Sequence, residues 1–374
     1  DLVVVGGGVG GMSAACAAAE AGLDVILIDE RMDSGGQFSK QPTPIHATSL
    51  ISRSDKQIRL GRELIERMKR AKVTVIQNGQ VWAGFPERDI LALVDGRTRL
   101  FRSQRLVIAT GAYERALPVE GWTLPGVITT GAAQSLLRTY HVVAGKKVFI
   151  AGNGPFNLQV ALELARAGAT IVGVAESASR PSIASIGALF DMYRGAPRLL
   201  FDGIRYVNQI KKRNIPLFYN YSLSSVRQLG DGLKATISSS SSVKRSQEKD
   251  ISIDADIVCM GYGFLPSNVL LRNLGCEHHY DTHRRQLIAN RSENFETTAP
   301  GIYAVGDCAG LGGAYAACEE GLIAGLHIAS SAGSTPSQRQ LEDLTESRLK
   351  LSRHRRFQSG LWRLYAAQLP KTVQ

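Results

Sequence analysis

Apolar and glycine-rich segments alternate in a regular order over the first thirty residues of the chain. Residues 2–5 are an apolar, mostly β-branched run that predicts a strand buried on both faces. A glycine-rich turn over 6–11 follows, then an alanine-dominated helix over 12–20 and a second apolar run over 25–28. This order predicts a strand–helix–strand unit with parallel strands.

Residues 147–176 repeat this order. Gly152 and Gly154 follow the first strand of the repeat, and Glu176 stands at the end of its second strand. Asn157 stands at the position that Gly11 has in the first unit. Its side chain would push the helix from the strand or crowd a bound pyrophosphate. Whether this second unit binds a nucleotide therefore stays open. Glu176 would repel a 2′-phosphate, which favours NAD or an adenine nucleotide over NADP.

Two further strand ends carry small residues. A buried run over 106–111 ends in Ala-Thr-Gly, where a planar or phosphorylated ligand can approach the backbone closely. A turn and strand over 300–305 lead to Gly306, Asp307 and a glycine-rich loop before a helix over 314–330. The aspartate can accept from a polyol hydroxyl, and the helix N-terminus can face a phosphate or an electron-rich ring edge.

The first unit has the residues that a dinucleotide site requires. Gly6 permits a sharp turn, Gly8 lets backbone amides approach a pyrophosphate, and Gly11 lets the helix pack close to the strand. The helix N-terminus presents free N–H groups to the phosphates. An acid about twenty residues further on accepts hydrogen bonds from ribose hydroxyls. Glu30 is favoured over Asp29 for this role, and a tight turn without a ligand is the alternative.

The remaining pattern is of mixed type. The expected elements are a basic amphipathic helix over 55–71, a strand over 73–76, a hairpin and a further strand over 81–102, helices over 183–213, a strand over 215–221 and a β ribbon that continues over 223–237.

Composition narrows the functional classes. A chain of 374 residues predicts two or three domains, and no apolar run approaches the ~18 residues that a membrane span needs. The five cysteines form no C-x-x-C pair and no zinc spacing, so we expect reduced thiols in the cytoplasm, no metal site and no redox dithiol. The net charge is +11, with basic clusters over 211–213 and 348–356. These clusters suit an acidic partner subunit or a membrane surface, and no nucleic-acid motif accompanies them.

Taken together, residues 6–30, 109–111 and 306–314 resemble the two-dinucleotide-domain flavoproteins of the glutathione and thioredoxin reductase superfamily. The resemblance implies an α/β fold with two Rossmann-like domains and a helical C-terminal tail. The discontinuous FAD-binding domain would cover 1–117 and 285–335, the inserted NAD-like domain 118–284, and the tail, 336–374, would contact another subunit.

The resemblance also implies which residues contact FAD. They are Gly6, Gly8 and Gly11 at the pyrophosphate; Glu30, with Asp29 and Arg31, at the adenosine ribose; Gly36 and Gln37 by the phosphates; Val81 by the adenine; Ala109, Thr110 and Gly111 at the next strand end; Gly306 and Asp307 at the ribitol; and Gly313 and Ala314 at the pyrimidine edge of the flavin. No catalytic side chain is assigned, because a flavin carries out the redox chemistry itself. Cys308 is interpreted as a small buried residue.

Within that superfamily the chain is most similar to the large subunits of opine oxidases, hydrogen cyanide synthase and dye-linked proline or hydroxyproline dehydrogenases. Residues 35–37, 109–115, 125–127, 152–155 and 306–314 carry this similarity. It implies a smaller flavoprotein partner that oxidises an amine, and a large subunit that passes electrons to an acceptor other than oxygen. FMN or a 2Fe–2S cluster would enter through partner subunits or a further segment, in a hetero-oligomer in the cytoplasm or peripheral to the inner membrane.

Two alternatives remain. One is a self-contained NAD(P)H-dependent flavin reductase without a redox dithiol, with the nicotinamide at Gly152 and Gly154. The other is a non-catalytic scaffold subunit that holds adenine nucleotides in both sites.

The last apolar stripe of the chain recurs at helical spacing and consists of Phe357, Leu361, Trp362, Leu364 and Tyr365. Such a stripe needs cover, which either the core of this chain or a partner subunit could provide.

Overall fold

The computed structural model describes residues 1–41, 55–240 and 250–365, which fall into two compact units. Unit 1 comprises Asp1–Tyr113 and Leu265–Arg355, and unit 2 comprises Glu114–Phe264 and the rest of the chain from Arg356. Where the chain leaves and re-enters unit 1, strands β8 (Ala112–Glu114) and β17 (Phe264–Pro266) pair with each other.

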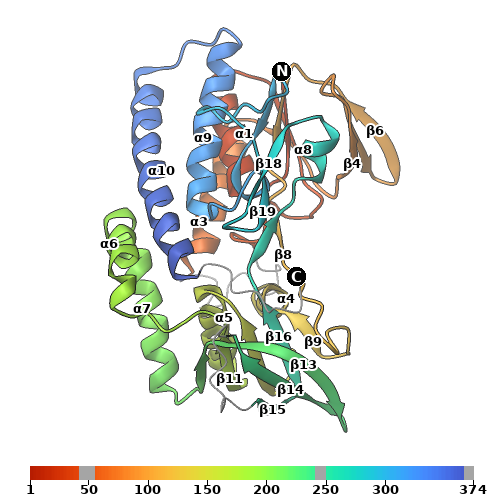
Figure 1. Cartoon of the computed structure of the whole chain (residues 1–374). Coiled ribbons are helices and arrows are strands. Elements are labelled where there is room, and N and C mark those ends of the chain that lie inside the picture. Colours follow the sequence, from red (N-terminus) through yellow and green to blue (C-terminus); the bar gives the residue numbers. More distant parts are fainter. Residues whose placement is uncertain (42–54, 241–249, 366–374) are drawn as a thin grey trace. The chain divides into compact units, whose positions relative to one another are not determined.

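Unit 1 is built on a five-stranded parallel sheet (Figure 1). The order across the sheet is β20-β7-β1-β2-β3, and every neighbouring pair is parallel. The strands are β1 (Leu2–Val5), β2 (Val25–Ile28), β3 (Thr74–Ile76), β7 (Arg105–Ile108) and β20 (Ile302–Ala304). The parallel strand–helix–strand unit expected from the first thirty residues is therefore confirmed, as is the α/β fold class.

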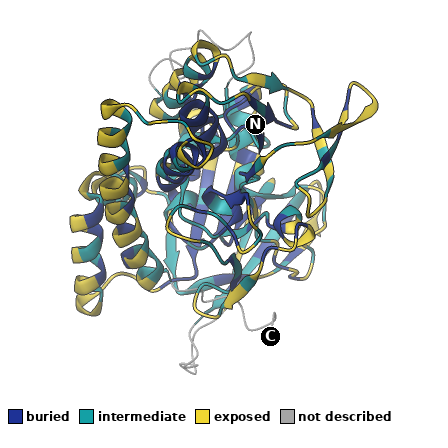
Figure 2. Ribbon diagram, turned by 90° about the horizontal axis from the view of Figure 1, so that it is seen from above, coloured by how far each residue is buried: buried dark blue, intermediate teal, exposed yellow. Residues whose placement is uncertain are grey.

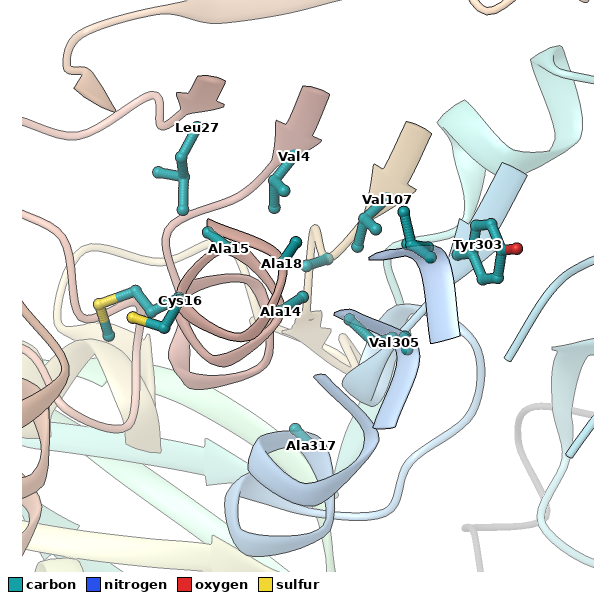
Figure 3. Packing of buried hydrophobic residues seen from close by; sticks show 14 of the residues in the cluster. Val4, Ala14, Ala15, Cys16, Ala18, Leu27, Val107, Tyr303, Val305 and Ala317 are labelled. Atoms are coloured by element: carbon teal, nitrogen blue, oxygen red, sulfur yellow. The ribbon is translucent and has the colours of Figure 1, made fainter. Parts of the chain in front are cut away.

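Helices cover one face of this sheet: α1 (Val9–Glu20), α3 (Lys56–Arg70), α9 (Ala314–Ser331) and the first part of α10 (Gln338–Leu364). Val4, Leu27 and Val107 point from the strands toward the alanines of α1 (Figure 3). Helix α1 is buried from Val9 to Ala18 and begins three residues earlier than expected. Figure 2 shows the buried segments of the chain in dark blue.

Helices α1 and α9 pack on each other through small residues. A Cβ on Gly321 would clash with the carbonyl oxygen of Gly10, and a Cβ on Gly325 would lie 2.5 Å from the carbonyl oxygen of Ala14. This close contact brings the two helix N-termini to the same side of the sheet.

The other face of the sheet carries an antiparallel sheet of β4 (Gln80–Gly84), β5 (Ile90–Val94) and β6 (Arg97–Phe101), together with α8 (Val269–Asn273) and the hairpin of β18 (His278–Asp281) and β19 (Gln286–Ala289). Leu271 and Leu274 share a core with Val3 and Ile108 of the parallel sheet. These contacts place residues 265–284 in unit 1, so the chain returns twenty residues earlier than the expected boundary at 285.

Unit 2 repeats the design with a second five-stranded parallel sheet, in the order β12-β11-β10-β16-β9. Its strands are β9 (Val127–Thr129), β10 (Lys147–Gly152), β11 (Thr170–Glu176), β12 (Leu217–Tyr219) and β16 (Ile257–Gly261). Helices α4 (Thr130–Tyr140), α5 (Pro155–Arg166) and α7 (Pro197–Lys212) bury one face. The antiparallel strands β13 (Tyr221–Leu229), β14 (Gly232–Ser239) and β15 (Ile251–Ala255) bury the other.

The C-terminal end of α10 packs within unit 2 against α6 (Ile186–Gly195), which follows a short 3₁₀ turn at Ile183–Ser185. Phe357 is buried, and a Cβ on Gly360 would lie 2.5 Å from the carbonyl oxygen of Ala188. The apolar stripe of the tail is thus covered at these positions by its own chain, which was one of the two alternatives.

Candidate functional site

The carboxyl ends of four parallel strands in unit 1 meet along one edge of the sheet. Since the sheet order is β20-β7-β1-β2, the segments that follow these strands begin at Val305, Ala109, Gly6 and Asp29, side by side. Ligands of open α/β sheets bind at this edge. The structure therefore brings together the four strand ends that the sequence pattern indicated.

The turn after β1 can be made only of glycine at two positions. Gly6 has a φ of +106°, and a Cβ on it would clash with the carbonyl oxygen of Ala109. A Cβ on Gly11 would clash with the carbonyl oxygen of Gly6. Both residues are thus needed for the fold itself, because they let α1 start directly against the sheet.

Gly8 differs from its neighbours because its backbone is extended and its surroundings are open. Its φ is −74°, and among the described residues the atom nearest to an added Cβ would be Gly36 Cα, 4.0 Å away. Gly8 is also the N-cap of α1, and no side chain of the described residues caps this helix end. The first-turn amides can therefore bind an anion such as a pyrophosphate.

A second glycine pair lies against this turn. Gly35 N donates to the carbonyl oxygen of Gly7 at 2.8 Å, and Gly36 has a φ of +61°. A Cβ on Gly36 would lie 2.8 Å from Gly8 Cα, so this close approach requires glycine. The next residue, Gln37, is exposed beside the turn and could contact a ligand.

The two acids after β2 have different surroundings. Asp29 is buried: its Oδ1 accepts from Arg31 N at 3.1 Å, and its Oδ2 has no partner among the described residues. Burial raises the pKa of the Asp29 carboxyl. The side chain of Glu30 is 70% exposed and only loosely paired with Arg31, at 4.0 Å. Glu30 is thus the acid that could reach a ribose diol, while Asp29 lies beneath the glycine turn.

Val81 lies two residues after Gly79, which contacts the ligand-binding edge of the first sheet. Gly79 N donates to the carbonyl oxygen of Asp29 at 2.8 Å, so β4 begins beside the end of β2. Val81 itself is half-buried and packs against the core on the face opposite α1.

At the end of β20, Asp307 organises the loop that leads into α9. Its Oδ1 accepts from Gly312 N at 2.9 Å and from Gly313 N at 2.8 Å. Burial raises the pKa of Asp307, and these two hydrogen bonds oppose that effect. Gly313 has a φ of +82° and is the N-cap of α9, which begins at Ala314 without a side-chain cap in the described part of the chain. A second helix N-terminus therefore faces this region.

The turn after β7 is anchored from within unit 1. Thr110 Oγ1 donates to the carbonyl oxygen of Ser267 at 2.7 Å, and the carbonyl oxygen of Gly111 accepts from Ser267 N at 2.9 Å. The backbone of residues 109–111 is thereby held at the sheet edge.

A buried ion pair that the sequence pattern did not predict supports this edge. Arg291 binds Glu320 at two points, with Nη1–Oε2 at 2.7 Å and Nη2–Oε1 at 2.9 Å. Glu320 Oε2 also accepts from Gly306 N at 2.9 Å, and Arg291 Nη1 donates to the carbonyl oxygen of Ala304 at 2.8 Å. The lone acidic pair at 319–320 in an otherwise small and apolar helix was the signal that could have indicated it.

The corresponding site in unit 2 is built differently. Asn157 does not displace α5; it is buried, and its Nδ2 donates to the carbonyl oxygen of Gly261 at 2.8 Å. Both Glu176 carboxylate oxygens accept from backbone amides of their own unit, Oε2 from Gly154 at 2.8 Å and Oε1 from Ala178 at 2.9 Å.

The cysteines do not pair with one another in the structure. All five lie in the described part of the chain and all are free. Cys308 is fully buried, and burial raises the pKa of its thiol to about 11. In the described residues no group of three or more His, Cys, Asp or Glu could hold a metal ion, and no helix there is long and apolar enough to cross a membrane.

The family model described as pyridine nucleotide-disulphide oxidoreductase matches residues 1–333. The chain belongs to this family. Its members are flavin-dependent oxidoreductases, and membership implies FAD as the cofactor.

Several similar proteins are subunits of multisubunit enzymes. An opine oxidase subunit from Rhizobium meliloti (strain 1021) is 29% identical over 339 residues, which is 89% of this chain and 71% of that protein. Hydrogen cyanide synthase subunit HcnB of Pseudomonas aeruginosa is 29% identical over 377 residues, 96% of this chain and 77% of that protein. For the corresponding opine oxidase subunit from Agrobacterium tumefaciens (strain Ach5) the identity is 30% over 346 residues, 87% of this chain and 64% of that protein.

Solved structures support the fold. Thioredoxin reductase of T. acidophilum superposes with a TM-score of 0.64 at 20% identity, covering 89% of this chain and 99% of that one. L-proline dehydrogenase of P. horikoshii gives a TM-score of 0.62 at 16% identity, covering 92% of this chain and 58% of that one.

The residues present fit FAD. The uncapped N-terminus of α1 and the open space over Gly8 and Gly36 suit a pyrophosphate, and the exposed carboxylate of Glu30 suits a ribose diol. The unpartnered, buried Asp29 Oδ2 lies directly beneath this cradle, since a Cβ on Gly7 would clash with it.

Proposed function

We propose that this chain is the FAD-binding subunit of a heteromeric dehydrogenase that acts on amino acids or opines. In this proposal a smaller flavoprotein subunit oxidises the substrate amine, and this chain takes part in passing the electrons to an acceptor other than oxygen. A bound FAD would supply the two-electron redox chemistry. FMN or a 2Fe–2S cluster would belong to partner subunits or to a further segment.

The observation that carries the proposal is the combination of an open dinucleotide cradle with five free cysteines. The cradle at Gly8 and Gly36 fits FAD, while every one of the five thiols is unpaired and four are buried. A disulphide reductase needs a redox dithiol, so this chain is suited to a different reaction of the family. The names of the opine oxidase and hydrogen cyanide synthase relatives indicate a subunit of an amine-oxidising complex.

The role of this chain's own residues is to hold and orient the cofactor. We propose that the amides of the first turn of α1 bind the pyrophosphate, Glu30 binds the adenosine ribose, and Asp307 binds the ribitol. The N-terminus of α9 at Ala314 would then face the pyrimidine edge of the ring system, where its positive end stabilises negative charge.

We propose that the partner subunit binds the exposed apolar surface of α6 and α7. This surface consists of Ile186, Phe190, Tyr193, Phe201 and Ile204 on the two helices and of Ile183 in the 3₁₀ turn before α6, and the least exposed of them, Ile204, is 47% accessible. Tyr193 and Phe201 make an edge-to-face contact at 6.4 Å, which joins the two helices into one patch. Aromatic and arginine side chains are enriched in protein interfaces.

The charge around this patch indicates the chemistry of the partner. Arg194 lies over the ring of Phe190, and the carboxylate of Asp191 is already paired with arginines of α10. The further basic residues on these helices are Arg198, Arg205, Lys211 and Lys212. A partner subunit with an acidic rim would therefore complement the surface.

The proposal is tested by purifying the complex from its native source and measuring reduction of an artificial dye with proline, opines and other secondary amines as substrates. We expect dye reduction by the complex and none by this chain alone with FAD bound. Dye reduction by this chain alone with an amine, or rapid reduction by NADH, would contradict the proposal.

A further inference from the structure

The loop after β10 occupies the position in unit 2 that the Gly6–Gly8 turn occupies in unit 1, yet its amides are already used. Gly154 N donates to Glu176 Oε2 at 2.8 Å, and Asn153 N donates to the carbonyl oxygen of Gly261 at 2.9 Å. In the first unit the acid at the matching position of the sheet is Asp29, whose Oδ2 has no hydrogen-bond partner among the described residues, and the next acid, Glu30, is exposed. A pyrophosphate would have to displace the Glu176 carboxylate from Gly154 before it could bind there.

The same loop is in contact with the end of helix α10. Asn153, between the two glycines, donates from its Nδ2 to the carbonyl oxygen of Tyr365 at 3.2 Å. The side chain of Tyr365 is partly buried, and this burial raises the pKa of its hydroxyl, as do the neighbouring Glu176 and Tyr219. The residue that follows helix α10 therefore lies against the glycine loop.

Two arginines fix this end of α10 in place. Arg356 Nε binds Asp191 Oδ1 at 3.2 Å, and Arg363 Nη2 binds Asp191 Oδ2, so both carboxylate oxygens of one residue on α6 hold two turns of α10. Between them Gly360 allows the close contact with Ala188 on the same helix. This contact is specific, because a larger residue at 360 would separate the helices.

We propose that Tyr365, the residue after α10, occupies the place on the second glycine loop where a dinucleotide binds in other members of the family. The end of α10 thereby excludes NAD(H) and NADP(H) from unit 2. Tyr365 is then a specificity-determining residue, since it prevents the protein from binding a nicotinamide dinucleotide. This inference does not depend on which amine the complex oxidises, and it holds whether or not the proposed partner subunit exists.

The test measures nicotinamide binding directly, by titrating the full chain with NADH and with NADPH and following the fluorescence of the nicotinamide. The double variant Arg356→Ala/Arg363→Ala removes both ion pairs from α10, and Asp191→Asn removes the same pairs from α6. Arg353→Ala, an exposed arginine on the same helix, is the matched control. Circular dichroism and the amount of bound flavin verify that each variant is folded.

We expect no saturable NADH binding by the wild type or by Arg353→Ala up to millimolar concentration, and an affinity at least tenfold higher in both variants that release α10. Saturable NADH binding by the wild type that the released variants leave unchanged would overturn the inference. Absence of binding by every protein would also overturn it, because α10 would then not be what excludes the dinucleotide.

Discussion

Arg291 and Glu320 form a buried ion pair that fixes the end of strand β20 to helix α9. Two hydrogen bonds join the side chains, at 2.7 and 2.9 Å, and a third joins Glu320 to Gly306 N at 2.9 Å. The side chains are only 15% and 5% exposed. Asp307 follows Gly306 directly, so this pair determines where the proposed ribitol-binding carboxylate stands.

Removing one partner of this pair is expected to be costly. Arg291→Ala leaves the Glu320 carboxylate buried and without its main partner, which destabilises proteins by about 3–5 kcal/mol. Urea unfolding of the wild type and the variant measures the difference. The control is Lys350→Ala, which removes the exposed partner of Glu346 and should cost less than about 1 kcal/mol. Equal effects of the two substitutions would show that the buried pair has no special role.

A substitution at Gly8 should affect cofactor binding without affecting folding. Because an added Cβ would meet no described atom closer than 4.0 Å, Gly8→Ala should leave the protein folded. The methyl group would point into the space proposed for the pyrophosphate, so we expect the flavin content to fall about tenfold or more. Gly203→Ala on α7, where an added Cβ likewise meets no described atom, is the matched control and should keep its flavin. Retention of full flavin by Gly8→Ala would contradict the proposed position of the cofactor.

Glu176 should make stability depend on pH. Burial raises the pKa of its carboxyl from 4.5 to about 7. In the unfolded chain this carboxyl ionises near pH 4.5, whereas in the folded protein it ionises only near pH 7. The stabilisation that it provides is therefore complete below pH 4.5 and is lost as the pH rises to about 7, by an amount on the order of 3 kcal/mol.

The measurement is urea unfolding between pH 5 and pH 8, as the difference between the wild type and Glu176→Gln. Because glutamine does not titrate, the wild type should lose stability relative to Glu176→Gln as the pH rises across this interval. A difference that stays constant with pH would show that Glu176 keeps its ordinary pKa in the folded protein.

Phe201 and Ile204 are central to the surface proposed for the partner. Replacing both with aspartate puts like-signed charge opposite the acidic rim and removes apolar contact, so we expect at least tenfold weaker binding of the small subunit on co-expression and co-purification. Leu229→Asp, an exposed leucine at the end of β13, is the control and should leave the complex intact. If the double variant still forms the complex at wild-type yield, the partner binds elsewhere.

Local pattern predicted much of the fold. The parallel sheets, the amphipathic helix α3 and the strand ends at Gly6, Ala109 and Gly306 follow from short apolar runs next to glycines, which are properties of neighbouring residues. The arrangement of the candidate site along one edge followed in turn from the order of parallel strands.

What the sequence did not predict depends on contacts between distant residues. Arg291 and Glu320 are 29 positions apart in the chain, and nothing near either one indicates its partner. Asn157 was expected to disturb α5, but its amide finds a carbonyl 104 positions away. The return of the chain at 265 depends on α8 packing into the first core, which local hydrophobicity cannot distinguish from packing in unit 2.

The central claim is that the first sheet edge holds FAD, and the most direct test is to denature the purified protein by heat and identify the released ligand by its visible spectrum and mass. We predict about one FAD per chain, with the yellow colour of an oxidised flavin, and its loss in Gly8→Ala. A colourless extract, or one that contains only an adenine nucleotide, would contradict the account.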